Sequence, residues 1–378
     1  MNDVAYFDWA ATAPMRPQAF EAMLPFLTTS YGNPSGSHRL ARRATLALDD
    51  AREVVAAALG VLPGEVVFTA GGTEADNLAI SGVLAATGGR AVCSAVEHHA
   101  VLDVVHHQGG TVVPVDATGL IDLDRLEAAL TDDVRVVSVM AVNNEVGTVQ
   151  PLRRVTRMVS KRAPQAVVHT DAVQGIVWTD VAATAKHAQL ISLSAHKFGG
   201  PQGVGALAVR AGTPLRAQLL GGGQERDRRS GTQNVAGIVA MAAALQQTVA
   251  ERDDSVARVG ALRDRLLDEL ALRIEGLRET VPRTTRHAGN AHVMIDGIEN
   301  EALLFLLDRA GICASAASAC ASGAVEPSHV LAALGHNRQA AATAVRFTLG
   351  WGSSDHDVDR LIEALPPAVA QLRERTRR

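Results

Sequence analysis

Short runs of apolar, often β-branched residues alternate with segments of helical periodicity over the first two thirds of the chain. Such an alternation is typical of a mostly parallel β-sheet with helices on both faces. Ligands bind to such sheets beyond the carboxyl ends of the strands, so the residues after each run are candidates for a site. The predicted strands are residues 66–69, 91–96, 111–115, 134–140, 166–171, 188–193 and 205–209, with a helix at 122–130.

The pattern changes towards the C-terminus. A long helical segment, residues 235–277, is broken only by charge-rich turns. A strand-like run at 290–296, an amphipathic helix at 301–307 and a late strand at 345–349 follow it. We interpret this part of the chain as a smaller α+β domain.

Composition narrows the class of protein. With 378 residues, 47% of them hydrophobic, the chain is long enough for a large domain plus a smaller one. The net charge of −4 argues against a nucleic acid or a membrane surface as the main partner. No apolar stretch reaches the roughly 18–20 residues that span a bilayer. Residues 1–8 lack the basic start of a signal peptide, so we expect a cytoplasmic protein.

Three cysteines, at positions 93, 313 and 320, are too few for a disulfide framework. No Cys-x-x-Cys pair is present to bind zinc. Cys93 lies in the middle of a predicted strand and is expected in the core, and Cys313, after a helix end, fits a core position as well. Cys320 lies among small residues in the segment 317–323, which predicts an accessible nucleophile on an exposed loop.

A lysine and an aspartate follow two of the predicted strands. Lys197 comes after the run 188–193, within the motif Ser-Ala-His-Lys, and Asp171 ends the run 166–171. Parallel strands that end at one sheet edge bring both residues into one crevice. A lysine that binds a cofactor covalently and a carboxylate that keeps a pyridine nitrogen protonated are the pattern of a pyridoxal phosphate (PLP) enzyme. A surface lysine and a helix-capping aspartate explain these two residues equally well.

A glycine-rich turn follows the strand that ends at Thr69. Gly71 and Gly72 let the backbone approach an anion closely, and Thr73 adds a hydroxyl donor at the start of a predicted helix. The turn matches neither the Walker motif nor the dinucleotide-binding motif. Taken alone, a plain turn with a helix cap is the simpler explanation.

Histidines follow the next predicted strand. His98 can stack on an aromatic cofactor and transfer protons, since the pKa of histidine lies near neutrality. The pair His106 and His107 invites a metal-site interpretation, but no carboxylate or cysteine set lies nearby. We therefore predict that this pair lies on a solvated helix face, and we predict no metal site.

Three further groups of polar residues lie at strand ends or in loops. Asn143 and Asn144 follow the strand 134–140, where an amide can bond to a phenolic oxygen of a cofactor. Gln174 lies one helical turn beyond Asp171, on the same side. The loop 221–232 is rich in glycine and arginine and suits a phosphate or a carboxylate, although a solvated turn explains it as well.

Taken together, these motifs resemble those of the cysteine desulfurases of the NifS/IscS type, in the class V branch of the fold-type I PLP enzymes. The resemblance covers nearly the whole chain, from 7–14 to 345–347, and is specific because seven motifs occur in the family's order. The motifs are residues 31–35, 72–74, 97–98, 143–145, 171–174, 194–197 and 318–331.

The resemblance implies an α/β fold of the PLP-dependent aminotransferase type. It implies a large domain, residues 14–255, with a mostly parallel seven-stranded sheet, and a smaller α+β domain made of residues 1–13 and 256–378. It also implies pyridoxal 5′-phosphate as the cofactor, L-cysteine as the substrate and an obligate homodimer.

Roles for single residues follow from the resemblance only. Lys197 carries the cofactor and moves the substrate α-proton, Asp171 pairs with the pyridine nitrogen, and His98 stacks on the ring. Arg346, together with Asn33, holds the substrate carboxylate. The implied cofactor-binding residues are Gly72, Thr73, His98, Asn144 or its neighbour Asn143, Asp171, Gln174, Ser194, His196, Lys197 and, reaching the neighbouring subunit, Thr232.

Cys320 is implied to attack the sulfur of the bound substrate, so that alanine leaves and a persulfide remains on Cys320. A thiolate on a loop can carry this sulfur from a buried cofactor to an external acceptor. The implied acceptors are an iron–sulfur scaffold protein or a tRNA-thiolation enzyme, and no direct contact with nucleic acid or membrane is expected.

The chain departs from the family pattern at three places. Trp9 stands where Asn is usual, Gln233 stands where Glu is common, and residues 321–323 are plainer than usual. None of these changes removes a catalytic group, although they leave the sulfur acceptor open. The alternatives are a selenocysteine lyase, another class V aminotransferase or lyase, and a non-catalytic protein that kept the fold.

Overall fold

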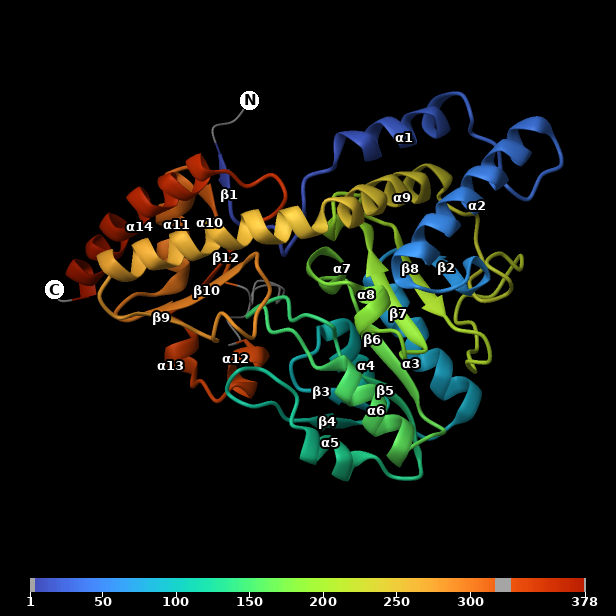
Figure 1. Ribbon diagram of the computed structural model, residues 1–378, viewed down its shortest axis with the longest axis horizontal. Coiled ribbons are helices and arrows are strands. Elements are labelled where there is room, and N and C mark those ends of the chain that lie inside the picture. The colour runs from blue at the N-terminus through green and yellow to red at the C-terminus, as the bar shows by residue number, and fades with distance from the viewer. Residues whose placement is uncertain (1–3, 317–327, 377–378) are drawn as a thin grey trace.

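The computed structural model describes residues 4–316 and 328–376. A large sheet with its helices forms one body, and a smaller α+β body lies beside it (Figure 1). The large sheet has seven strands in the order β2-β8-β7-β6-β5-β3-β4, and the predicted runs form these seven strands. The strands are β2 (Val66–Thr69), β3 (Arg90–Ser94), β4 (Thr111–Val113), β5 (Val134–Ser138), β6 (Val167–Asp171), β7 (Leu190–Ser194) and β8 (Gly205–Val209).

The predicted, mostly parallel sheet is confirmed. Only β8 runs antiparallel to its two neighbours, β2 and β7, and the other adjacent pairs are parallel. All residues of β6, β7 and β8 are buried, because helices cover both faces of the sheet. This explains why these strands show no regular alternation of apolar and polar residues.

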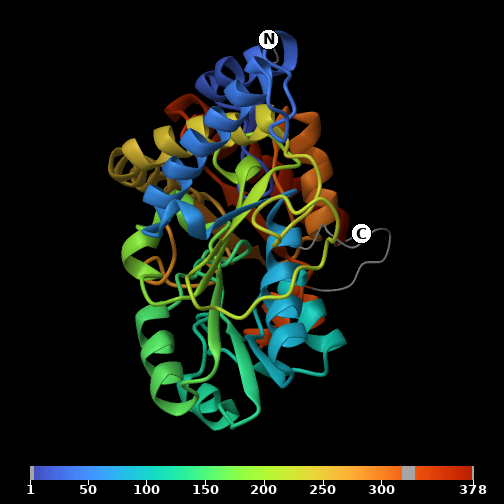
Figure 2. The same ribbon diagram turned by 90° about the vertical axis from the view of Figure 1, so that its right-hand side faces the viewer.

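Two core clusters lie on the two faces of the sheet. Neighbouring residues of one strand belong to different clusters, as Val67 and Phe68 of β2 do, because successive side chains point to opposite faces. Helices α3 (Gly72–Thr87) and α4 (His99–His107) cover one face. Figure 2 shows the opposite face covered by other helices, including α6. They are α2 (Arg39–Leu59), α5 (Leu123–Ala129), α6 (Leu152–Arg162), α7 (Gly175–Trp178), α8 (Val181–Thr184) and α9 (Val235–Ala250), with α1 (Pro17–Thr28) packed on α9.

The smaller body has its own core, around the edge-to-face pair Phe7 and Phe347. Its antiparallel sheet has the order β12-β10-β9, and the short β1 pairs with β11. The elements are β1 (Ala5–Tyr6), β9 (Leu277–Glu279), β10 (Asn290–Ile295), β11 (Ile312–Cys313), β12 (Ala344–Thr348), α10 (Arg252–Arg273), α11 (Asn300–Arg309), α12 (His329–Ala333), α13 (Arg338–Ala341) and α14 (Asp355–Thr376).

The long helical segment predicted at 235–277 is two helices, α9 and α10, that meet at Glu251. Its predicted end was wrong, since Leu277 begins β9 after a turn at Gly276, whose φ is +73°. The domain boundary expected between residues 255 and 256 falls inside α10, which runs from one body to the other (Figure 1). That boundary stays a prediction. Within residues 4–316 and 328–376, no helix has both the length and the apolar run that crossing a bilayer requires.

Candidate active site

A cavity of about 460 Å³ lies at the carboxyl ends of the strands, between the large sheet and the smaller body. Strands β3, β5, β6 and β7 run in one direction, so the residues that follow them meet at this edge. Most of the predicted site residues line the cavity. They are Gly72, Thr73, His98, Asn144, Asp171, Gln174, Ser194, His196, Lys197 and Arg346.

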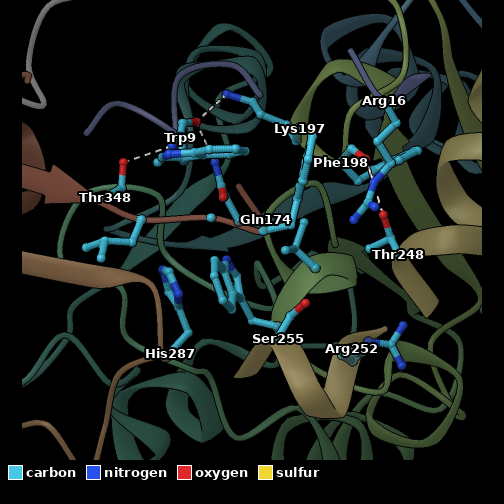
Figure 3. A pocket seen from close by; sticks show the side chains of 16 residues that line it. Trp9, Arg16, Gln174, Lys197, Phe198, Thr248, Arg252, Ser255, His287 and Thr348 are labelled. Carbon is cyan, nitrogen blue, oxygen red and sulfur yellow. Dashed lines mark hydrogen bonds between the residues drawn. The ribbon is translucent and has the colours of Figure 1, made fainter. Parts of the chain in front are cut away.

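Lys197 lies at the end of a short 3₁₀ turn, η2 (Ala195–Lys197), directly after β7. Its Nζ donates hydrogen bonds to the carbonyl oxygens of Ala10, at 2.7 Å, and Ala11, at 2.9 Å. The Gln174 side chain donates to the same Ala10 oxygen at 2.7 Å (Figure 3). The N-terminal segment therefore orients both side chains by its backbone, a contact that no sequence motif indicated.

Asp171 ends β6, and its carboxyl group is fully buried. One of its oxygens accepts a hydrogen bond from the Val173 N–H at 2.8 Å. Burial raises the pKa of Asp171 to about 6, with a further contribution from the nearby carboxyl of Asp76. A buried carboxylate at a cavity wall is strongly stabilised by a cationic partner in that cavity, as a protonated ring nitrogen would be.

His98 is the N-cap of α4, and its Nδ1 accepts a hydrogen bond from the Ala100 N–H at 3.1 Å. Burial lowers the pKa of His98 below its ordinary value of 6.5, with Asp171 acting in the opposite direction. The ring is therefore neutral near pH 7, and its remaining nitrogen, Nε2, carries the proton. A neutral ring at the cavity wall can stack on an aromatic cofactor and exchange protons.

The start of α3 forms the anion-binding end of the cavity. No side chain of the described residues caps this helix, so its first N–H groups are available to a ligand. A Cβ at Gly72 would lie 2.9 Å from the Val173 Cγ2 atom, which excludes larger residues there. Thr73, Ser194 and His196 surround this end, and burial, with Lys197 next to it, lowers the pKa of His196 to about 4. The donor set fits a phosphate group.

Arg346 reaches the cavity from β12 of the smaller body. Its guanidinium contacts the Asp8 carboxylate at 2.7 Å and the Asn144 carbonyl oxygen at 2.8 Å. Its Nε is buried and has no hydrogen-bond partner among the described residues. Asp8 also lines the cavity. Asp8 lies in the N-terminal motif, residues 7–14, but the sequence predicted no role for it.

The two neighbouring asparagines, Asn143 and Asn144, have different environments. The Asn143 side chain is buried away from the cavity, where it donates to the Val96 carbonyl oxygen and accepts from two backbone N–H groups. Asn144 lines the cavity. Of the two, Asn144 is therefore in position for a ligand.

Other predicted residues do not reach this cavity within one chain. Asn33 is exposed and accepts a hydrogen bond from the Ser35 N–H, and Thr232 is exposed on its loop. Cys320 lies outside the described residues.

Cys93 is in the core as predicted, whereas Cys313 is only half-buried, because it lies on the short strand β11. His106 and His107 are exposed at the end of α4.

Trp9, one of the three departures from the family pattern, lines a small space together with Lys197. Its ring meets that of Trp351 edge to face, with centroids 5.5 Å apart, and a Cβ at Gly350 would lie 2.1 Å from it. A second, smaller space of about 30 Å³ separates Trp9 and Lys197 from Thr248 and His287 (Figure 3). Trp9 therefore fills the back wall of the site instead of contacting the main cavity.

A lysine, a buried carboxylate, an uncapped helix start and a neutral histidine on one cavity fit PLP as the resident cofactor. Residues 5–361 match the family described as aminotransferase class-V, and the chain belongs to that family.

Within the class-V family, the chain belongs with the cysteine desulfurases. It is 39% identical to the IscS cysteine desulfurase of Dictyoglomus turgidum, over 99% of this chain and 96% of the relative. It is 43% identical to an IscS-like cysteine desulfurase of Mycobacterium tuberculosis, over 98% of this chain and 97% of the relative. A solved NifS-like protein superposes with a TM-score of 0.91 at 35% identity, over 97% of this chain and 100% of that chain. The predicted family and fold class are confirmed.

Proposed function

We propose that this protein is a cysteine desulfurase that converts L-cysteine and the Cys320 thiol into L-alanine and a persulfide on Cys320. The reaction balances, because the substrate loses one sulfur atom and the thiol gains it. The observation that carries the proposal is that Lys197, Asp171, His98 and Arg346 meet at one cavity. The protein uses PLP, which withdraws electrons from the bonds at the substrate α-carbon when it is bound.

The residues that line the cavity have different roles in the proposed reaction. Lys197 holds the cofactor and moves the proton at the substrate α-carbon, with its Nζ oriented by the carbonyl groups of residues 10 and 11. Asp171 provides the negative charge for the ring nitrogen, and neutral His98 stacks on the ring and exchanges protons. Gln174 and Asn144 contact the ring oxygen, while Gly72, Thr73, Ser194 and His196 hold the phosphate.

Arg346 binds the substrate carboxylate in this proposal. The guanidinium is buried and already oriented by Asp8 and by the Asn144 carbonyl, so little side-chain entropy is lost on binding. A solved relative described as SspA in complex with cysteine shares 30% identity over 91% of this chain and 98% of its own, with a TM-score of 0.79. This supports L-cysteine as the substrate. Asn33 has no such support within one chain.

We also propose that the protein is a homodimer. Thr232 is assigned to the phosphate of the neighbouring subunit, which agrees with its exposure and its absence from the cavity of its own chain. Helix α1 also exposes apolar side chains at helical spacing, at Phe20, Leu24 and Leu27. Static light scattering of the purified protein tests this assignment, and a monomer that retains full activity would contradict it.

The proposal also covers the sulfur acceptor and the cellular compartment of the protein. We propose an acceptor protein, either an iron–sulfur scaffold or a tRNA-thiolation enzyme, in the cytoplasm. The support is the similarity to IscS proteins over nearly the whole chain. Transfer of labelled sulfur from the persulfide to purified candidates of each kind distinguishes the two acceptors.

The test of the function is the release of alanine and sulfide from L-cysteine by the PLP-loaded protein, with a thiol reductant, for the wild type and Cys320→Ala. We expect the variant to lose activity while the visible cofactor band remains. Equal alanine release by both proteins contradicts the persulfide step and favours a lyase, with selenocysteine as the next substrate to test. No release by either protein, with the cofactor bound, contradicts the choice of substrate.

A further inference from the structure

Asp76 is a buried carboxyl group for which the proposed reaction has no use. It lies on α3, is 1% exposed, and lines the cofactor cavity together with Asp171. Its Oδ1 atom has no hydrogen-bond partner among the described residues, and the nearest ring nitrogen of His169 is 3.4 Å away. An ionised carboxylate is costly in such a place, since burial without hydrogen bonds disfavours the charged form.

A polar chain connects Asp76 to the strand that carries Asp171. The His169 ring lies between two hydroxyl groups, with Nδ1 2.8 Å from Ser138 and Nε2 2.9 Å from Ser192. These residues lie on β5, β6 and β7 and are fully buried. Asp171 is two residues beyond His169 on β6, so both side chains are on the sheet face that α3 covers, and Ser192 is the register partner of Asp171.

Several ionisable groups meet here, and three of them are the buried carboxyl groups of Asp76, Glu97 and Asp171. Burial raises the pKa of Asp76 to about 7, with Ser192 acting in the opposite direction, and it lowers the pKa of His169 to about 4. Three adjacent buried carboxylates cannot all be ionised, because like charges in a low-dielectric site repel strongly. Among the described residues, the ionisable groups near this cluster are Glu97, with Cys93 beside it, and His98 from the β3 side, His169 and Asp171 from β6, and Lys197 beyond β7.

We propose that Asp76, linked through Ser192 and His169, is a positioning residue that takes up a proton at neutral and lower pH, so that Asp171 alone carries the negative charge for the ring nitrogen. This inference rests on the cofactor binding proposed above. Asp76 then acts as a pH-dependent control on the cofactor, since its ionisation places a second negative charge at the cavity wall. That charge favours the protonated forms of the groups near it.

The test compares the wild type with Asp76→Asn, which has the shape of the protonated carboxyl but does not ionise. The visible band of the PLP-loaded proteins is recorded from about pH 5 to about pH 9, together with the PLP dissociation constant. We expect the two spectra to coincide at acidic pH and to diverge above about pH 7. There the wild type keeps the protonated form of the cofactor to a pH about one unit higher.

Two further variants make the result specific. Ser192→Ala removes a hydroxyl that favours ionised Asp76, so the divergence from Asp76→Asn starts at a higher pH. Thr170→Val, at an equally buried neighbour whose hydroxyl has no hydrogen-bond partner in the described part of the chain, leaves the wild-type titration unchanged. Spectra of the wild type and Asp76→Asn that coincide at every pH, or that differ equally at every pH, overturn the inference. A wild type without a visible cofactor band contradicts the proposed function instead.

Discussion

The Asp8 carboxylate and the Arg346 guanidinium contact each other at 2.7 Å across 338 residues of sequence. Asp8 follows β1 and Arg346 lies in β12, so the pair connects two segments of the smaller body, far apart in sequence, at the wall of the cavity. Within residues 4–316 and 328–376, the buried Nε of Arg346 has no hydrogen-bond partner beside this pair. We infer that Asp8 holds the guanidinium in the orientation that a substrate carboxylate requires.

Replacement of Arg346 by lysine should therefore raise the KM for L-cysteine by about 10-fold to 100-fold, since a planar fork with two charge-assisted hydrogen bonds is lost. We expect kcat to change less. Arg265→Lys, at a half-buried arginine outside the cavity that pairs with two aspartates, is the matched control and should behave as the wild type. A fall in kcat at unchanged KM would argue against carboxylate binding by Arg346.

Cofactor affinity should depend on pH through Asp171. Its pKa in the ligand-free protein is raised to about 6, so the carboxyl is protonated below that pH and must lose its proton when it pairs with the cationic ring nitrogen. We expect the affinity of the apoprotein for PLP to fall as the pH drops through about 6. Fluorescence titration with PLP measures this, and Asp171→Asn should bind weakly with a flatter pH dependence. An unchanged profile in the variant would show that another group is responsible.

A buried ion pair holds the loop that carries Thr232. Arg52 on α2 binds Glu225 through two contacts, of 2.8 and 3.0 Å, and the same carboxylate accepts the Phe68 N–H. Glu225→Gln leaves a buried cation without its partner, so we expect a loss of about 3–5 kcal/mol in the free energy of unfolding. Urea denaturation of the apoprotein measures it.

The control for this ion pair is Glu269→Gln, which breaks the exposed pair with Arg273 and should cost less than about 1 kcal/mol. Equal losses in both variants would contradict the role that we assign to burial.

Gly350 should not tolerate a side chain. A Cβ there would lie 2.1 Å from the Trp9 ring, which is itself held against Trp351, so Gly350→Ala must displace the back wall of the site. We expect a loss of about 1–3 kcal/mol in stability, measured by thermal unfolding, together with weaker PLP binding. Gly64→Ala, where an added Cβ meets nothing within 4 Å, is the control. Unchanged stability of Gly350→Ala would mean that the Trp9 ring moves freely.

The sequence by itself determined the strands of the large sheet and the chemistry at their ends. Strands buried on both faces begin with apolar residues, Val-Val in β6 and Leu-Ile in β7, and show no regular alternation of apolar and polar positions. Parallel strands must also end at the same edge of the sheet. Asp171 ends one such strand, and Lys197 and His98 come a few residues after two others. Their meeting at one cavity was therefore predictable from local pattern alone.

Only the tertiary structure decided which distant groups contact these residues. The carbonyl groups of residues 10 and 11 hold Lys197, Asp8 holds Arg346, and Asp76 lies over the β6 strand through contacts between elements far apart in sequence. Asn144 lines the cavity, whereas the side chain of Asn143 is held by hydrogen bonds to the backbone of neighbouring segments. Local periodicity carries no information on such contacts, because packing between elements determines them.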